Sequence, residues 1–283
     1  MKTANIGSFY DPEDPKDASI FNNLTLYGSI FAKGNIKLSG NQKSYIDGDV
    51  FSGGNVTIDK SGAKITGSLN YAGTLSPESY KEAGGGNQKY PILDSYFLEY
   101  LLPKPFPLES YLDPKAKKIN INNEILTLNP GAYGDTFSNN GGTLRLSNGD
   151  YYFNSVTGKM TIDIKNISSG IRIFIAGDFE AQGSGINMTI NGSPIDINNP
   201  SHREIASLIY IEVQGNISMT SNEKFAGTIY ASNPDKDKGY ITLKNIPTII
   251  GALYARGEVI QNNTLTIYYI PADENNLPDT WSK

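Results

Sequence analysis

The chain has 283 residues, of which 24 are Lys or Arg and 29 are Asp or Glu, giving a net charge of −5, and it contains no cysteine. The acidic balance argues against a nucleic-acid partner, and the absence of cysteine excludes disulfides, Cys-ligated zinc and thiol nucleophiles. No run of about 18 apolar residues would span a bilayer, and the N-terminal stretch lacks the apolar core of a signal peptide. We therefore expect either a cytosolic protein or part of a longer exported chain.

A short motif recurs along the chain. GSIFAKGNIKLSG starts at residue 28, GDVFSGGNVTIDKSG at residue 48 and GALYARGEVIQNN at residue 251. Its first glycine recurs at Gly28, Gly48 and Gly67, at spacings of 20 and 19 residues. A related three-residue motif, glycine followed by a polar and then an apolar residue, begins at Gly177 and again at Gly215, 38 residues later. This spacing indicates a coil that repeats about every 20 residues rather than duplicated independent domains.

Between the glycines, apolar and polar residues alternate as they do in strands. Over residues 24–32, Leu24, Leu26 and Ile30 share one face, while Tyr27 and Phe31 point to the other. The same alternation recurs over residues 46–52, 171–175 and 249–255. We predict an all-β, right-handed parallel β-solenoid (β-helix), in which each coil buries its apolar face by stacking on its neighbours. An antiparallel sandwich or jelly roll is the alternative, but it has no reason to keep a constant glycine spacing.

Two segments interrupt the repeat. Residues 74–124 form a long insertion rich in proline and aromatic residues, in which Asp94 can cap a short helix over residues 95–102 that ends before Pro103. Residues 182–206 carry His202, the single histidine. We predict one domain, with first coils over residues 24–73, a main solenoid over residues 125–270, and tails at 1–23 and 271–283.

The sequence offers little for enzymatic chemistry. It has no G-x-S-x-G turn and no phosphate-binding loop, and its one histidine lies in a turn-rich segment. Asp47 and Asp49 share an outward face, so they are either an acid/base or metal pair or an ordinary solvated surface. The segment at 235–239, DKDKG, resembles the start of a calcium loop but has Ile246 where the loop needs Glu. We expect no enzyme and no cofactor, with calcium as the one ion to consider.

Aromatic side chains occupy one outward slot of successive coils. Coils stack about 4.8 Å apart, so rings in one slot form a stripe along the axis. A large exposed apolar patch on a polar chain marks a contact surface. The stripe consists of Phe31, Phe51, Phe174, Tyr230 and Tyr254, with Glu212 in the one coil that differs.

The alternative is that the insertion folds over the stripe and buries it. The outer face of the insertion then becomes the contact surface, because Tyr96 and Tyr100 lie at i and i+4 of the predicted helix. In either case, flat rings in a row suit a long, flat ligand such as a polysaccharide. The candidate carbohydrate-binding residues of the insertion are Tyr90, Tyr96, Phe97, Tyr100, Phe106 and Tyr111.

The segments LTLNPGAYGDTF, LRLSNGDYYFNSV, IRIFIAGDF, FAGTIYASN and IIGALYARGEV carry a family resemblance. Together they resemble the β-solenoid domain of type IV pilus-associated proteins of the PilX-like, minor-pilin kind, over about residues 125–267. With its aromatic insertion the chain looks most like the C-terminal domain of the tāpirins, cellulose-binding surface adhesins of plant-biomass-degrading thermophilic bacteria. The resemblance implies a β-helix core, an extracellular cell-surface location, no catalysis, cellulose as the partner and contact with type IV pilus components.

Three other functions stay open at this point. A pilus-associated receptor for DNA or another macromolecule predicts a basic groove. A β-helix polysaccharide lyase or glycosidase predicts two carboxylates, or a carboxylate with an arginine such as Arg145, Arg172 or Arg256, converging in a groove. A purely structural filament module predicts that the aromatic stripe is fully buried.

Overall fold

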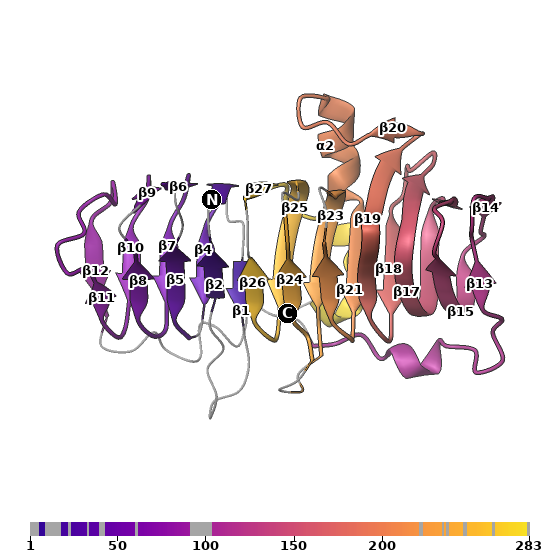
Figure 1. The fold of residues 1–283 in the computed structure, drawn as a ribbon, viewed down its shortest axis with the longest axis horizontal. Helices are drawn as coiled ribbons and strands as arrows, with labels where there is room; N and C mark the ends of the chain where they lie inside the picture. The colour runs from indigo at the N-terminus through magenta and orange to yellow at the C-terminus, as the bar shows by residue number, and fades with distance from the viewer. Residues whose placement is uncertain are drawn as a thin grey trace.

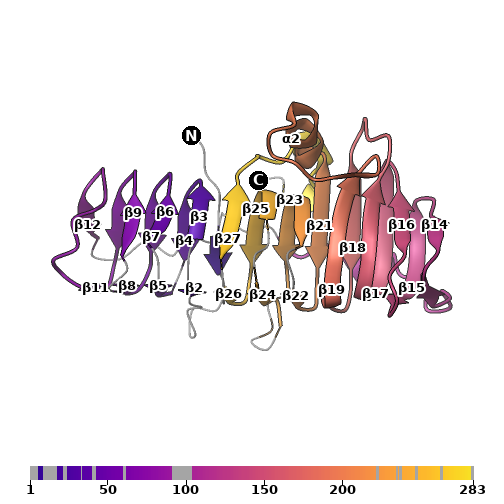
Figure 2. The ribbon, with the colours of Figure 1, turned by 45° about the horizontal axis from the view of Figure 1, so that its top comes forward.

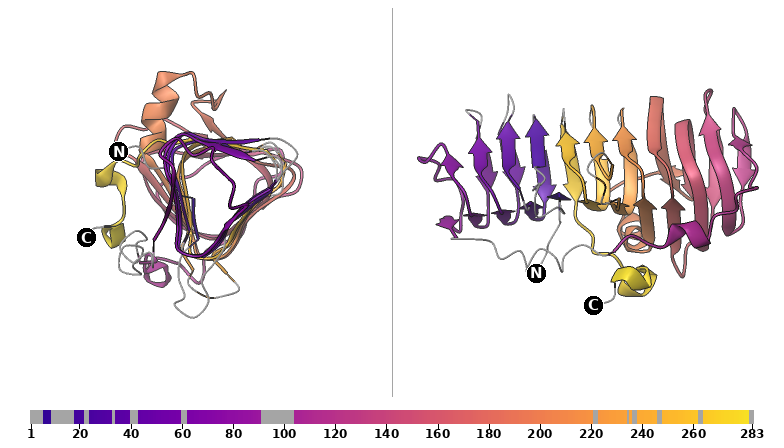
Figure 3. Two further views of the ribbon diagram at one scale, coloured as in Figure 1. Left: turned by 90° about the vertical axis from the view of Figure 1, so that its left-hand side faces the viewer. Right: turned by 90° about the horizontal axis from the view of Figure 1, so that it is seen from below.

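The computed structural model is a β-solenoid of triangular cross-section (Figure 3). It describes residues 6–8, 18–21, 24–32, 34–39, 43–59, 62–90, 104–220, 223–233, 235, 238–245, 248–261 and 264–281. The described strand pairings are parallel, apart from the hairpin between β19 (Phe179–Ile190) and β20 (Ser193–Pro194). The predicted all-β parallel solenoid is therefore confirmed, and the antiparallel sandwich is wrong.

The first described strand lies in the middle of the solenoid, and the coils wind outward from there to one end (Figure 1). This N-terminal half comprises β1 (Ile6–Ser8), β2 (Ala18–Phe21), β3 (Leu24–Tyr27), β4 (Ile30–Ala32), β5 (Ile36–Ser39), β6 (Ser44–Ile46), β7 (Val50–Ser52), β8 (Val56–Ile58), β9 (Ala63–Ile65), β10 (Leu69–Tyr71), β11 (Leu75–Ser76) and β12 (Asn87–Lys89). Residues 104–118, with the 3-10 helix η1 (Leu108–Ser110), then run below the strands toward the opposite end (Figure 1).

From that opposite end, the second half winds back to the middle. It comprises β13 (Ile119–Asn120), β14 (Ile125–Thr127), β15 (Gly131–Ser138), β16 (Thr143–Leu146), β17 (Gly149–Ile164), β18 (Ile171–Ile175), β19, β20, α2 (Pro200–Ser207), β21 (Ile209–Val213), β22 (Ile217–Met219), β23 (Lys224–Ala231), β24 (Ile241–Leu243), β25 (Thr248–Ala255), β26 (Val259–Gln261) and β27 (Leu265–Tyr268), followed by η2 (Glu274–Asn276) and η3 (Asp279–Trp281).

The first and last coils pair with each other in the middle of the solenoid, at a place that we call the junction. There β25 pairs with β1, β26 with β2 and β27 with β3, so the parallel ladders continue across it (Figure 2). Two half-solenoids that wind in from opposite ends thus share one set of sheets. The solenoid also extends beyond the predicted boundaries, because β1 and β2 lie in the predicted tail and β12 in the predicted insertion.

Stacked corners explain why glycine recurs. A Cβ atom on Gly48 would lie 2.2 Å from the carbonyl oxygen of Gly28, and one on Gly67 would lie 2.7 Å from that of Gly48. In the second half, a Cβ atom on Gly251 would lie 2.0 Å from the carbonyl oxygen of Gly227. Each coil therefore approaches the next more closely than any side chain permits, which fixes glycine at these corners.

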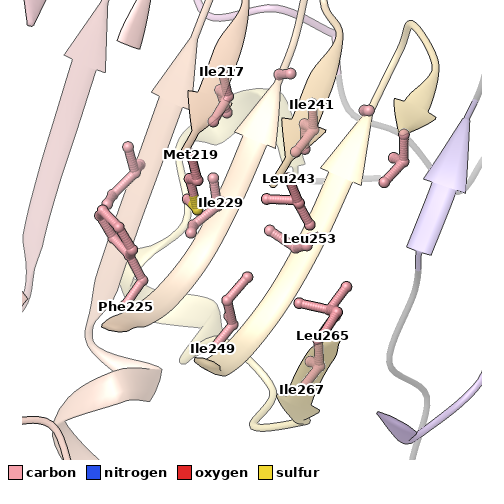
Figure 4. Close-up of a cluster of buried hydrophobic side chains, with 14 of the residues drawn as sticks. Ile217, Met219, Phe225, Ile229, Ile241, Leu243, Ile249, Leu253, Leu265 and Ile267 are labelled. Atoms are coloured by element: carbon pink, nitrogen blue, oxygen red, sulfur yellow. The ribbon is translucent and has the colours of Figure 1, made fainter. Parts of the chain in front are cut away.

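The inward side chains form one continuous core. Figure 4 shows a section in which Ile217, Met219, Phe225, Ile229, Ile241, Leu243, Ile249, Leu253, Leu265 and Ile267 pack between the sheets. These residues come from β22 to β27, so each coil buries its apolar face against side chains of the same coil and of its neighbours. Burial of this core is the main stabilising contribution to the fold.

The second interruption of the repeat forms a helix outside the solenoid. Asn199 caps α2, since its side chain accepts a hydrogen bond from the Ser201 N–H at 3.1 Å, and Pro200 occupies the first helical position. The short helix predicted over residues 95–102 lies outside the described residues. Within the described part of the chain, no helix is long and apolar enough to cross a membrane.

Candidate functional site

A cavity of about 640 Å³ opens at the junction, and we call it the junction pocket. This volume lies within the usual range for ligand pockets in proteins. Its apolar lining comes from Ile197, Ile270 and Pro271. Its aromatic and polar lining consists of Tyr27, Asp47, Asn198, Arg203, Tyr268 and Tyr269.

The tyrosines of the junction pocket come from both ends of the chain. Tyr268 of β27 is the register partner of Tyr27 of β3, and their rings stack with centroids 4.9 Å apart and an interplanar angle of 11°. Tyr27 is 41% exposed although its ring has this partner. The Tyr269 N–H donates to the Tyr27 carbonyl oxygen at 3.3 Å, and burial raises the pKa of the Tyr269 phenol. The ladder that closes the solenoid therefore also holds the rings at the pocket.

Hydrogen-bonding groups flank these rings. Asp47 follows Tyr27 in the next coil, and its Oδ1 accepts a hydrogen bond from the Thr66 hydroxyl at 2.8 Å. An ionised carboxylate can accept further hydrogen bonds through its other lone pairs. The exposed side chains of Asn198 and Arg203 reach the pocket from α2 and the loop before it. Apolar surface with a few convergent polar groups is typical of small-molecule and glycan sites.

The single histidine has a structural role. His202 is buried, and its Nδ1 accepts a hydrogen bond from the Asp196 N–H at 3.0 Å. This bond ties the first turn of α2 to the loop that leads to Asn198. His202 therefore helps to fix one side of the junction pocket without lining it.

The described residues give no support for a metal site. No group of three or more His, Asp or Glu side chains gathers among them in a way that could hold an ion. The carboxylate of Asp49 accepts a hydrogen bond from the Ser68 N–H at 2.7 Å, so it contributes to the stacking of two coils. Part of the calcium-like segment at 235–239 lies outside the described residues.

The predicted aromatic stripe exists as a continuous row. Its members are register partners along one face, in the order Tyr152, Phe174, Glu212, Tyr230, Tyr254, Gly7, Phe31 and Phe51. Glu212 occupies the slot at which the sequence departs from the aromatic pattern. The strand alternation therefore predicted this row correctly across both halves.

Of the two possibilities left open for the stripe, exposure to a ligand and burial under another segment, burial holds for most of its length. Phe31, Phe174, Tyr230 and Tyr254 are buried, and Phe51 is half-buried. Two segments, residues 104–112 and 277–281, lie over the stripe in the second half, and we call them the cover. These four rings are therefore not available to a polysaccharide. The alternative predicts that the insertion folds over the stripe, and residues 104–112 of the insertion do so, whereas residues 277–281 belong to the predicted C-terminal tail.

Two aromatic side chains of the cover make the main contacts. Phe106 stacks on Phe174 with centroids 4.2 Å apart. Trp281 lies edge-on to three tyrosines, with its centroid 5.9 Å from that of Tyr230 and 5.3 Å from that of Tyr254. Its indole N–H donates to the Tyr210 hydroxyl at 2.8 Å. The stripe is thus an internal surface on which both segments of the cover, residues 104–112 and 277–281, pack.

Glu212 binds the cover through its carboxylate. Its Oε1 accepts from the Phe106 N–H at 2.7 Å, and its Oε2 accepts from the Tyr210 hydroxyl at 2.6 Å. Gln214 completes the contact, since its Nε2 donates to the Phe106 carbonyl oxygen at 2.6 Å. Burial raises the pKa of Glu212, against the opposing effect of these hydrogen bonds. The one polar slot of the stripe is therefore the attachment point of its cover.

Replacing Glu212 with alanine is expected to loosen the cover. The variant leaves the Phe106 N–H and the Tyr210 hydroxyl without their acceptor, so the free energy of unfolding should fall by about 2 kcal/mol. Limited proteolysis should cut residues 104–112 faster than in the wild type. The control is Glu212→Gln, which keeps an acceptor oxygen and should be cut more slowly than the alanine variant. Equal cleavage of all three proteins would contradict this role.

The other predicted contact residues divide into two groups. Tyr96, Phe97 and Tyr100 lie outside the described residues. Tyr90 is 38% and Tyr111 is 46% exposed, whereas Phe106 is half-buried in the cover. Exposure alone does not make Tyr90 and Tyr111 a binding face, and their predicted contact with polysaccharide stays a prediction.

The arginines considered for a catalytic groove have structural partners. Arg172 forms two hydrogen bonds with Asp150, and the Nε of Arg145 lies 3.3 Å from the Oδ2 of Asp163. The Nε of Arg256 donates to the Tyr230 hydroxyl at 2.7 Å. These contacts join neighbouring coils of the solenoid.

Sequence reasoning did not find the junction pocket, although one signal was present. The stretch LTLY at residues 24–27 and the stretch LTIY at residues 265–268 are near copies, and in the structure they pair residue for residue. A search for matched motifs at the two chain ends would have placed Tyr27 beside Tyr268. The contributions of Asn198 and Arg203 carried no such signal, because they come from the irregular second interruption.

No protein-family model matches the sequence, and no curated protein matches it. Among solved structures, a match is the DUF3494 domain of an ice-binding protein from Shewanella frigidimarina. That match has 14% sequence identity and a TM-score of 0.30, and it covers 96% of this chain and 100% of that domain. The resemblance to tāpirins and pilus-associated proteins stays a prediction.

Proposed function

We propose that this protein is a non-catalytic surface adhesin that binds polysaccharide, with cellulose as its first candidate ligand, through the junction pocket. The observation that carries the proposal is the stacked pair of the exposed Tyr27 and the half-buried Tyr268 beside a carboxylate and a guanidinium in one cavity. In this proposal the junction pocket is the contact surface, in place of the aromatic stripe, which is covered.

The chemistry of this lining suits a sugar. A pyranose ring has apolar C–H surfaces and a rim of hydroxyl groups that both donate and accept hydrogen bonds. Tyrosine offers an apolar ring with a polar tip, Asp47 accepts from hydroxyls, and Arg203 donates to them. A neutral glycan uses all of these groups without requiring a net charge on the pocket.

The same lining supports binding rather than cleavage. Most glycosidases use a pair of carboxylates that flank the scissile bond, whereas Asp47 is the one carboxylate among the described residues that line the pocket. A DNA receptor would need a run of cationic side chains to neutralise phosphates. Arg203 is the one cationic side chain in this described lining. An extracellular, cell-surface location and contact with pilus components are parts of the proposal that come from the sequence resemblance.

A pull-down on microcrystalline cellulose tests the proposal, with xylan, chitin and double-stranded DNA in parallel and sugar release measured in the same samples. We expect Asp47→Ala, and the double variant Tyr27→Ala with Tyr268→Ala, each to weaken cellulose binding about tenfold, which corresponds to about 1.4 kcal/mol. Asp47 is exposed, and among the described residues its side chain hydrogen-bonds to the exposed Thr66, so its variant should keep the wild-type melting temperature.

Tyr90→Ala tests the rival site on the insertion. It removes a ring of similar exposure at the far end of the N-terminal half, so it should leave binding unchanged. Weaker binding in Tyr90→Ala alone would move the site to the predicted insertion face. Retention on DNA instead of cellulose, or release of sugar by the wild type, would show that the adhesin proposal is wrong.

A further inference from the structure

We infer that the junction pocket binds the end of a linear glycan chain, and that the rest of this chain lies along the outward face of β3, β6 and β9. This inference rests on the proposed function and adds the part of the polymer that is recognised. It follows from one row of outward side chains, which α2 covers on one side of the junction and which is exposed on the other side.

The row continues in register across both halves. Its members, in order along the axis, are Ala226, Ile250, Tyr268 and Tyr27, which are register partners, and then Asp47 and Thr66, which directly follow the register partners Ile46 and Ile65. Their sequence neighbours Ile249, Ile267, Leu26 and Ile46 are also register partners, and Figure 4 shows Ile249 and Ile267 packed inward between the sheets. All six members therefore belong to the same outer surface of the solenoid, and a linear ligand that follows the axis would pass over them.

One side of this row is closed. Ala226 and Ile250 are fully buried although they point outward. The helix α2 packs on β23 and β25, the strands that carry these two residues, and Figure 1 shows it standing over them. Arg203 and Asn198 line the pocket from this side. A glycan that enters the pocket from the N-terminal half therefore meets α2 and its preceding loop and cannot continue.

The other side of the row is open. Beyond Tyr27, both Asp47 and Thr66 are exposed. A second row of outward side chains lies two residues earlier on the same strands. In it, Tyr45 of β6 lies edge-on to Tyr27 with centroids 6.0 Å apart, and Nζ of Lys64 in β9 lies 5.9 Å from the Tyr45 ring centroid. Coils stack about 4.8 Å apart, so the surface from β3 to β9 extends about 10 Å from the pocket. That length accommodates further sugar units outside the pocket.

The junction pocket and the outward face of β6 and β9 therefore have different roles. Arg203 and Asn198 contact the terminal sugar, so they act on every ligand regardless of its length. Tyr45 and Lys64 contact only the units outside the pocket, so they act on longer chains. The closed side makes the end of the chain, rather than an internal segment, the part that is bound.

End-blocked oligosaccharides test the inference directly. Titration calorimetry would compare cellohexaose with two derivatives that carry a bulky tag on the reducing end or on the non-reducing end. We expect one of the two tags to weaken binding about tenfold or more, since that end must enter the pocket. If both derivatives bind as tightly as untagged cellohexaose, chain-end recognition is wrong while polysaccharide binding stands. If neither cellohexaose nor cellulose binds, the proposed function fails and the inference fails with it.

Two variants add an independent readout with cellobiose and cellohexaose as probes. We expect Arg203→Ala to weaken both ligands by a similar factor of about five to ten, and Tyr45→Ala to weaken cellohexaose alone. As the control, Ile125→Ala removes an exposed apolar side chain of β14, outside both regions, and should change neither. Equal effects of Tyr45→Ala on both ligands, or none on either, would overturn the path proposed along β6 and β9.

Discussion

Replacing Gly48 with alanine is expected to lower the free energy of unfolding by about 3 kcal/mol, because the added methyl group has no room. Its Cβ atom would lie 2.2 Å from the Gly28 carbonyl oxygen and 2.5 Å from the Gly28 carbonyl carbon. Both atoms belong to the backbone of the adjacent coil, so no rotation of a side chain relieves the contact. Relief requires the two coils to separate, which would also lengthen the ladder hydrogen bonds on either side.

The control for this prediction is Gly86→Ala. Gly86 has a φ of +82°, but an added methyl group there would have no atom within 4 Å, so alanine costs only the conformational penalty of about 1 kcal/mol. Urea denaturation of both variants and the wild type would measure the difference. Equal losses of stability in the two variants would mean that the spacing of the coils does not fix glycine at the corners. Each coil contacts mainly its neighbours, so the loss should be greatest near β4 and β7.

The repeat pattern predicted the fold because a solenoid is specified locally. Glycine spacing sets the length of a coil, and alternation decides which side chains point inward. These two rules placed Phe31 and Phe174 in one row, although they belong to different halves of the solenoid. Within each half, stacking follows the order of the chain, so local rules suffice.

The same rules could not predict the junction. The pairing of β27 with β3 joins coils that are far apart in the sequence, and alternation does not say which coil lies next to which. Residues 104–118, which run below the strands toward the opposite end, make this arrangement possible. They contain no copy of the repeat that could be aligned with the coils. The matched stretches LTLY and LTIY are the one local trace of the pairing.

A periodic pattern likewise cannot predict whether an outward row of side chains is buried. Alternation shows that Tyr230 points away from the core, but it does not show that Trp281 lies against it. The same limit applies to Ile250, which points outward and is buried beside α2. In both cases an irregular segment provides the contact. The candidate site therefore depends on the parts of the chain that interrupt the repeat, and these had to be seen in the structure.

Replacing Asp163 of β17 with asparagine is expected to lower the free energy of unfolding by about 3 kcal/mol at neutral pH. The Asp163 side chain is only 2% exposed. Its Oδ1 accepts from the Gly192 N–H at 2.7 Å and from the Thr189 hydroxyl at 2.9 Å, and its Oδ2 lies 3.3 Å from both Arg145 and Lys165. Asparagine removes the charge and presents an amide to these donors. Because Gly192 begins the loop that leads to Asn198, the variant should also loosen one side of the junction pocket.

Asp163 should also make stability depend on pH. Burial by itself raises the pKa of Asp163, but the Gly192 N–H, the Thr189 hydroxyl and Lys165 outweigh it, so the net pKa is lowered. A carboxyl whose pKa is lower in the folded state binds fewer protons there than in the unfolded chain. Its contribution is therefore complete above about pH 4, the pKa of an unperturbed Asp, and is lost as the pH falls through the folded-state value.

Urea denaturation at neutral pH and at about pH 3 would test this dependence, since the difference between wild type and Asp163→Asn should shrink in acid. Asp135→Asn is the matched control, because Asp135 is 41% exposed and pairs with an exposed Lys118 at 3.2 Å. It should cost less than about 1 kcal/mol at either pH. A difference between wild type and Asp163→Asn that stays constant down to pH 3 would show that this carboxylate is not held ionised by its partners.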